Sequence, residues 1–194
     1  MNYAKSYIDC YREYSAAVAA EKAARAALEN EYNDHSITKA TFEAKLATIL
    51  ETAPKEVEFR KKADKICNDF EIAYASWIAP DGSKVDAADL AVLDPVFITS
   101  AADLQHIADR HNANPTMAKP IREYAVKHSL NVRILDVEAP LKAMNTLRLF
   151  AKRALSDFDG YSANCLKNDG FCQKLIDLAA VMDGKVLLTD TIEE

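Results

Sequence analysis

Residues 55–79 read KEVEFRKKADKICNDFEIAYASWIA, and this stretch determines the fold expected for the rest of the chain. Its apolar residues recur in steps of four, three, four, three and four, at Phe59, Ala63, Ile66, Phe70, Ala73 and Trp77. A period of about 3.5 residues keeps one seam of a helix facing a partner helix. No Gly or Pro interrupts the stretch, so it predicts one continuous helix that packs against other helices.

The composition of the whole chain also favours long helices. Only four Gly and six Pro occur among 194 residues, whereas average usage gives about 14 and about 10. This scarcity argues against a turn-rich all-β fold. The net charge is −6 and the basic residues are scattered, so nucleic acid is not expected as the main ligand. No apolar run approaches the ~20 residues of a membrane span, and the N-terminus lacks the apolar core of a signal peptide. No membrane partner is therefore expected, and the expected location is the cytoplasm.

Two further helices are predicted before the central stretch. Residues 2–32 form the first, and eight alanines between Ala16 and Ala27 favour helix and permit close approach of another helix. The second begins after Thr38 and ends at Pro54, whose ring clashes with the preceding turn. Thr52 is then expected to cap the helix that follows. Three helices joined by short connections predict an antiparallel hairpin or pairing between chains.

Beyond Pro80-Asp81-Gly82-Ser83 the predicted elements are shorter. The first two are a brief helix capped by Asp86 and a helix opened by a capping box of Ser100 and Asp103. A third follows Asn114-Pro115, with Pro120 expected to loosen or restart it. The later elements are a short strand at Val132–Leu135 without an obvious partner, helices around residues 140–158 and 171–182, and a tail containing Val186–Leu188 and Glu193-Glu194.

These patterns predict an all-α protein with two parts. Residues 1–79 form a long helical hairpin or coiled-coil arm. Residues 80–194 form a smaller helical domain with a C-terminal tail. The boundary is placed at Pro80 because the heptad pattern ends there and turn-forming residues follow.

The sequence contains no catalytic signature, so no enzymatic activity, cofactor or metal is expected. Cys165 and Cys172 lie seven residues apart, too far for the usual short zinc-ligand spacing, and are interpreted as thiols packed between helices. His106 and His111 lie five apart and point to different parts of a helix. The three aspartates Asp86, Asp89 and Asp94 suit helix starts and a turn better than a calcium loop.

The predicted functional feature is an association seam. It comprises Tyr7, Tyr11, Tyr14 and Val18 of the first helix and Phe59, Ile66, Phe70 and Trp77 of the central helix. Tyrosines suit an interface that is dry at one end and wet at the other. The same side chains also fit a seam inside one chain. Because three helices form a thin core, self-association is expected, with a dimer as the simplest closed form.

One part of the chain resembles a known family. Leu93-Asp94-Pro95, the Thr99-Ser100 cap and Asn114-Pro115-Thr116-Met117 occur in this order, and Lys119, Ile121 and Tyr124-Ala125 follow. Over roughly residues 36–130 the chain resembles a family of helical phage and prophage proteins from Gram-positive bacteria. Pro120 departs from that pattern, and residues 131–194 match nothing in it. The resemblance implies a structural or assembly component and supplies no catalytic residues.

The sequence therefore predicts a non-enzymatic, scaffold-like protein of phage or prophage assembly that acts through helix-mediated association. Its expected partners are a second copy and other virion proteins, in the bacterial cytoplasm or in assembling virions. The alternative is a small regulatory or nucleic-acid-binding adaptor, which would need a basic face.

Overall fold

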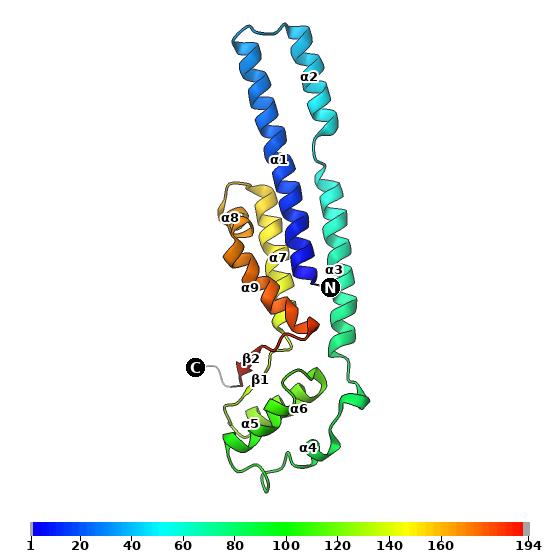
Figure 1. The fold of residues 1–194 in the computed structure, drawn as a ribbon, viewed down its shortest axis with the longest axis vertical. Helices are drawn as coiled ribbons and strands as arrows, with labels where there is room; N and C mark the ends of the chain where they lie inside the picture. The colour runs from blue at the N-terminus through cyan, green and yellow to red at the C-terminus, as the bar shows by residue number, and fades with distance from the viewer. Residues whose placement is uncertain (1, 192–194) are drawn as a thin grey trace.

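The computed structural model describes residues 2–191, and within them the predicted all-α fold is confirmed (Figure 1). The α-helices are α1 Tyr3–Asn33, α2 Lys39–Thr52, α3 Glu56–Ile78, α4 Ala87–Ala91, α5 Ala101–Arg110, α6 Pro115–Lys127, α7 Ala139–Ser156, α8 Tyr161–Lys167 and α9 Asp169–Ala179. The described residues also contain two 3₁₀ turns, η1 Gly82–Lys84 and η2 Ala180–Asp183. The two strands are β1 Arg133–Leu135 and β2 Leu188–Asp190.

The first three helices form the predicted long hairpin. α1 runs in one direction, and α2 and α3 return beside it almost end to end (Figure 1). Pro54 separates α2 from α3. Thr52 does not cap α3 as expected, because it still belongs to α2, where its hydroxyl donates to the Thr48 carbonyl oxygen at 3.1 Å. α3 begins without a side-chain cap. Two acidic residues in its first turn instead stabilise the positive, N-terminal end of the helix dipole.

The first hydrophobic core lies around the N-terminal half of α1. Helices α3, α7, α8 and α9 all pack against this half, whereas the rest of α1 projects beyond them together with α2 (Figure 1). The buried members are Ala4, Tyr7, Ile8, Tyr11, Phe59, Ala63, Cys67, Phe70, Ala143, Met144, Leu147, Ala151, Ala154, Ala163, Leu166, Cys172, Leu175 and Ala179. Burial of this much apolar surface is the main stabilising contribution to the fold.

This core does not follow the boundary expected at residues 79 and 80. Helices α7 to α9 come from the later segment, yet their apolar residues share one core with α1 and α3. Polar contacts fix the same arrangement. Arg12 donates to the Leu166 carbonyl oxygen at 3.0 Å and to Asp169 Oδ1 at 2.8 Å. The boundary expected between residues 79 and 80 therefore does not separate the two cores, because the apolar face of α7 needs a partner and α1 provides it.

The second hydrophobic core is smaller. It contains buried residues of α5, α6 and β1, and Val181 of η2 also belongs to it. β1 pairs antiparallel with β2, with Ile134 opposite Thr189. The strand expected near residues 132–135 thus has a partner within the segment that was expected to be a tail. Glu193 and Glu194 of that tail lie outside the described residues.

Local helix signals are mostly confirmed in this second part. The capping box of Ser100 and Asp103 is present. Asn114 accepts hydrogen bonds from the backbone N–H groups of Thr116 and Met117 at 3.1 and 3.4 Å, and Pro115 begins α6. Pro120 does not restart α6, which runs unbroken to Lys127. The lost backbone hydrogen bond is offset because the helix buries its apolar face on both sides of Pro120.

Candidate functional site

Four members of the predicted association seam lie in the interior of a single chain. Tyr7, Tyr11, Phe59 and Phe70 are between 0% and 5% exposed and belong to the first core. Burial raises the pKa of the Tyr7 and Tyr11 hydroxyls, so these side chains remain neutral at physiological pH. The seam expected between chains is therefore occupied within one chain at these positions, because α1 and α3 pack their aromatic rings against each other and α7, α8 and α9 also contact α1.

The other four members are partly buried and are spread over different surroundings. Tyr14 stacks on Phe59 with ring centroids 5.0 Å apart, and Ile66 packs against the first core. Trp77 packs against the second core instead, at the far end of α3. Val18 belongs to neither core among the described residues. The structure thus does not bring the eight residues together as one exposed surface.

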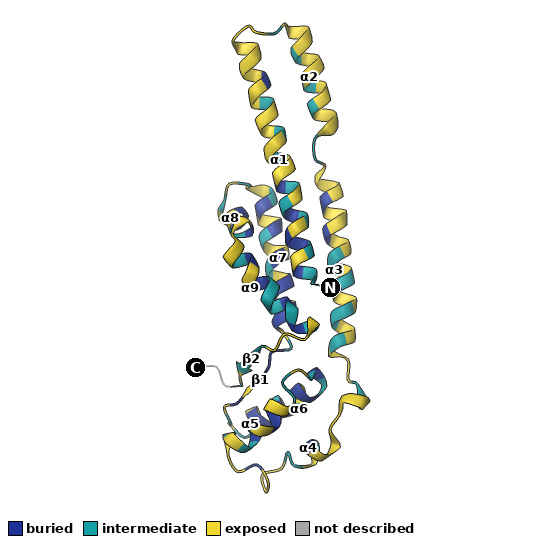
Figure 2. Cartoon of the chain, viewed as in Figure 1, coloured by how far each residue is buried: buried dark blue, intermediate teal, exposed yellow. Residues whose placement is uncertain are grey.

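The surface that remains open is the distal arm, which we define as residues 16–53. Figure 2 shows this part as mostly exposed, unlike the lower half of the hairpin. Leu28 is the only buried residue of α1 in the arm, and α2 has none. Near the tip, the rings of Tyr32 and Phe42 are tilted relative to one another, with their centroids 4.9 Å apart. Two helices alone hold the arm together.

A groove follows the hairpin between α1 and the returning helices, and we call it the arm groove. Three adjoining hollows form it. The first and second share the lining residues Ala17 and Pro54, and the second and third share Ala24 and Ile49. The lining residues are Cys10, Glu13, Tyr14, Ala17, Ala20, Glu21, Ala24, Ala27, Leu28, Glu31, Lys45, Thr48, Ile49, Thr52, Ala53, Pro54, Lys55, Glu58, Phe59 and Lys62. Along α1 the groove is lined by four alanines, Ala17, Ala20, Ala24 and Ala27, whose small side chains leave room for those of another helix.

Charged groups along the arm groove occur in pairs of opposite sign. Glu31 lies 2.8 Å from Lys45 across the hairpin, and Glu21 pairs with Arg25 one turn along α1. Glu13 and Lys62 are 4.0 Å apart at the other end of the groove. The groove therefore presents both signs of charge along its length, rather than one strongly charged wall.

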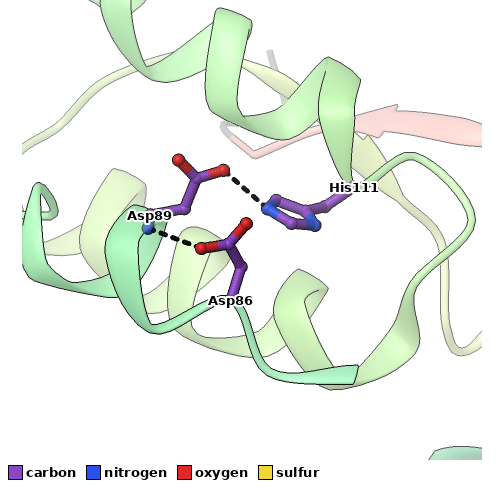
Figure 3. A group of neighbouring side chains, drawn as sticks. All are labelled: Asp86, Asp89 and His111. Atoms are coloured by element: carbon purple, nitrogen blue, oxygen red, sulfur yellow. Dashed lines mark hydrogen bonds and ion pairs between the residues drawn. The ribbon is translucent and has the colours of Figure 1, made fainter. Parts of the chain in front are cut away.

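A separate polar cluster joins α4 to the end of α5 (Figure 3). Asp86 caps α4 and accepts hydrogen bonds through Oδ1 from the backbone N–H groups of Ala88 and Asp89, both at 3.0 Å. The Asp89 carboxylate is buried and faces His111, whose Nε2 lies 2.8 Å from Asp89 Oδ2. Arg110 donates to both oxygens of Asp89, at 3.0 and 2.5 Å.

The charged partners in this cluster shift the protonation equilibrium of Asp89. Hydrogen bonding from Arg110 holds the pKa of Asp89 below its usual range, burial opposes this effect, and the His111 contact lowers the pKa further. Asp86, Asp89 and His111 each offer a ligand atom, and these atoms lie within 4.8 Å of one another. Within residues 2–191 this is the group that could hold a metal ion.

Sequence reasoning identified these residues but did not combine them. Asp86 and Asp89 were grouped with Asp94, and His111 with His106. Asp94 instead caps the following turn, where it accepts a hydrogen bond from the Val96 backbone N–H at 2.8 Å. His106 is exposed on α5. Asp89 and His111 are 22 residues apart, and no local pattern connects them.

The cysteines agree with the interpretation as packed thiols. All four are free; Cys67 and Cys172 are buried, and Cys10 and Cys165 are partly exposed. Burial raises the pKa of the Cys172 thiol, whose Sγ donates to the Leu166 carbonyl oxygen at 3.2 Å. A raised pKa keeps the thiol protonated and unreactive.

Comparison with known proteins adds no assignment: no protein-family model, curated protein or solved structure matches this chain. Among the described residues, no helix is both long enough and apolar enough to cross a membrane.

Proposed function

We propose that this protein acts through helix-mediated self-association of its distal arm, as a structural or assembly component rather than an enzyme. The observation that carries the proposal is that α2, a helix of 14 residues, contains no buried residue. Isolated helices of this length are marginal in water, and most helical stability in proteins comes from packing of one face. A second helical layer over the arm groove would supply that packing.

A second copy of the chain is the proposed partner. In a twofold-symmetric dimer, if residue i of one copy contacts residue j of the other, then residue j of the first copy contacts residue i of the second. The surface must therefore be complementary to itself. The arm groove carries both signs of charge and is lined along α1 by small alanine side chains, and both features permit such a contact. Two hairpins packed in this way form a four-helix bundle, with each groove covered by the other arm.

The setting we propose is phage or prophage assembly. It rests on the resemblance of Leu93-Asp94-Pro95 and Asn114-Pro115-Thr116-Met117 to the helical phage family. In the structure these residues form the turn before α5 and the capped start of α6, away from the arm. The arm would then join copies to one another, while the second core region would be free to contact other virion proteins.

Sedimentation equilibrium at tens of micromolar tests the self-association. The wild-type chain is expected to form dimers. Ala20→Arg places a long side chain in the arm groove at an exposed helical position, where Arg retains good helix propensity. This variant is expected to be monomeric with unchanged helical content by circular dichroism.

Ile49→Lys and Ile72→Lys form a matched pair for the same experiment. Ile49 lines the arm groove, whereas Ile72 is 72% exposed on α3. Only the Ile49 variant should lose dimers. A wild-type chain that stays monomeric would reject the proposal, and dimers that survive both Ala20→Arg and Ile49→Lys would show that the arm groove is not the contact.

A further inference from the structure

The cluster of Asp86, Asp89 and His111 lies far from the arm and has no part in the proposed association. Its members come from two elements, the start of α4 and the residue after α5, which the fold brings together across the second core region (Figure 3). Asp89 Oδ2 and His111 Nε2 are 2.8 Å apart, and an Asp86 oxygen completes a group within 4.8 Å. Two carboxylates and one imidazole thus converge on one small volume.

We propose that Asp86, Asp89 and His111 bind one divalent transition-metal ion, with Zn²⁺ as the type case. Imidazole nitrogen combined with carboxylate oxygen suits Zn²⁺ and its first-row neighbours. Ca²⁺ and Mg²⁺ prefer ligand sets made entirely of oxygen, so His111 disfavours them. Three protein ligands leave further coordination positions for water, as in open zinc sites.

The contacts already made by the three residues are compatible with this role. Asp86 uses Oδ1 to cap α4, which leaves Oδ2 for the ion. Arg110 donates to both Asp89 oxygens, Nε to Oδ2 and Nη2 to Oδ1, and so fixes the orientation of the carboxylate, as hydrogen-bonding partners of metal ligands do. Oδ2 accepts from Arg110 and also faces His111 Nε2, so its second lone pair is the one that would bind the ion. On binding, the ion replaces the contact between His111 Nε2 and Asp89 Oδ2, and each atom donates a lone pair to it. The proton is then carried by Nδ1 of the neutral ring.

Access to the site comes from the Asp86 side. Asp86 is exposed, whereas the His111 side chain is 11% and the Asp89 side chain 12% exposed. An ion can therefore meet Asp86 first and reach the other two ligands without opening a hydrophobic core. The bound ion would connect α4, a helix of only five residues, to the end of α5.

Titration with Co²⁺ tests the proposal, because this ion replaces Zn²⁺ and gives visible d–d absorption. The wild-type chain should bind one Co²⁺ per chain, and Zn²⁺ should displace it. Asp86→Asn is the sharpest variant, since Asn caps a helix as well as Asp does but lacks the charged ligand oxygen. Asp86→Asn and His111→Gln should each weaken binding by about tenfold or more. The control is His106→Gln, at an exposed position of α5, which should bind as the wild type does.

Three results would overturn the proposal. The first is no binding of Co²⁺ or Zn²⁺ by the wild-type chain. The second is wild-type affinity in either Asp86→Asn or His111→Gln, with folding checked by circular dichroism. The third is an intense near-ultraviolet sulfur-to-cobalt band, which would assign the ion to a thiol such as the partly exposed Cys10 or Cys165.

Discussion

Phe70 shows how a seam residue contributes to this fold. Its ring is 2% exposed and contacts two aromatic rings, edge-on to Tyr3 at 5.9 Å and stacked with Tyr74 at 5.6 Å. Tyr3 belongs to α1, so Phe70 joins α3 to the first core. Its position predicts a role in folding rather than in contact between chains.

Phe70→Asp should therefore strongly destabilise the fold. A charge placed in this site without a partner lowers the free energy of unfolding by about 3–5 kcal/mol. Urea denaturation measures the change. Ile72→Asp is the control, two residues away and 72% exposed, and it should change stability by less than about 0.5 kcal/mol. If the Phe70→Asp chain keeps wild-type stability but no longer forms dimers, Phe70 contributes to an interface between chains, as the sequence predicted.

Asp89 should make the stability of the fold depend on pH in the acidic range. Its folded-state pKa is lowered by the Arg110 hydrogen bond, against an unfolded value of about 3.9. A lowered carboxylate pKa means that the folded state prefers the ionised form. The resulting stabilisation is complete above the unfolded pKa and disappears as pH falls through the folded pKa.

The matched variant is Asp89→Asn, which is close in shape but does not titrate in this range. As the pH is lowered below about 5, the free energy of unfolding of the wild type should fall more steeply than that of Asp89→Asn. Denaturation curves at several pH values give both slopes. Equal slopes would mean that the Arg110 contact does not favour ionised Asp89.

At the scale of elements, local signals predicted helix ends well. The Ser100–Asp103 capping box and the Asn114-Pro115 start were visible in sequence because their hydrogen bonds join residues two or three apart. β1 was predicted as a short strand at Val132–Leu135, but its partner β2 was not predicted. The Leu188–Asp190 strand is only three residues long, too short for a clear alternating pattern.

Packing between elements was harder to predict. The Phe59–Trp77 seam required some apolar partner, and its period correctly indicated helices. Many amphipathic helices satisfy that requirement, so the pattern did not show that α7 to α9 would cover α1. The Asp89–His111 contact escaped prediction for a similar reason, because 22 residues separate two side chains that only the second core brings together.

At the scale of the whole molecule, the chain returns to its starting helix. Arg12 contacts Asp169 at 2.8 Å, a separation of 157 residues in sequence. The exposed link after α3 therefore connects segments that also hold one another through the first core.

A protease site inserted at Gly82-Ser83 should show this directly. Cleavage there is expected to leave both fragments associated, because the first core contains residues from each side of the cut. Size-exclusion chromatography in native buffer should give one peak containing both fragments, and strong denaturant should separate them. Fragments that separate in native buffer would support the two independent units expected from the sequence.

The late arrival of α7 to α9 also matters during synthesis. At about 5–20 residues per second, roughly 7–30 s pass between translation of residue 33 and residue 179. Until α7 is made, the tyrosine face of α1 has at most α3 to cover it, and the cover is complete only with α9. A nascent chain in this state exposes an aromatic surface that invites chaperone binding or premature contact with neighbouring nascent chains. Slow codons after residue 79 would lengthen that exposure, so the yield of folded protein should depend on how quickly the message beyond that codon is translated.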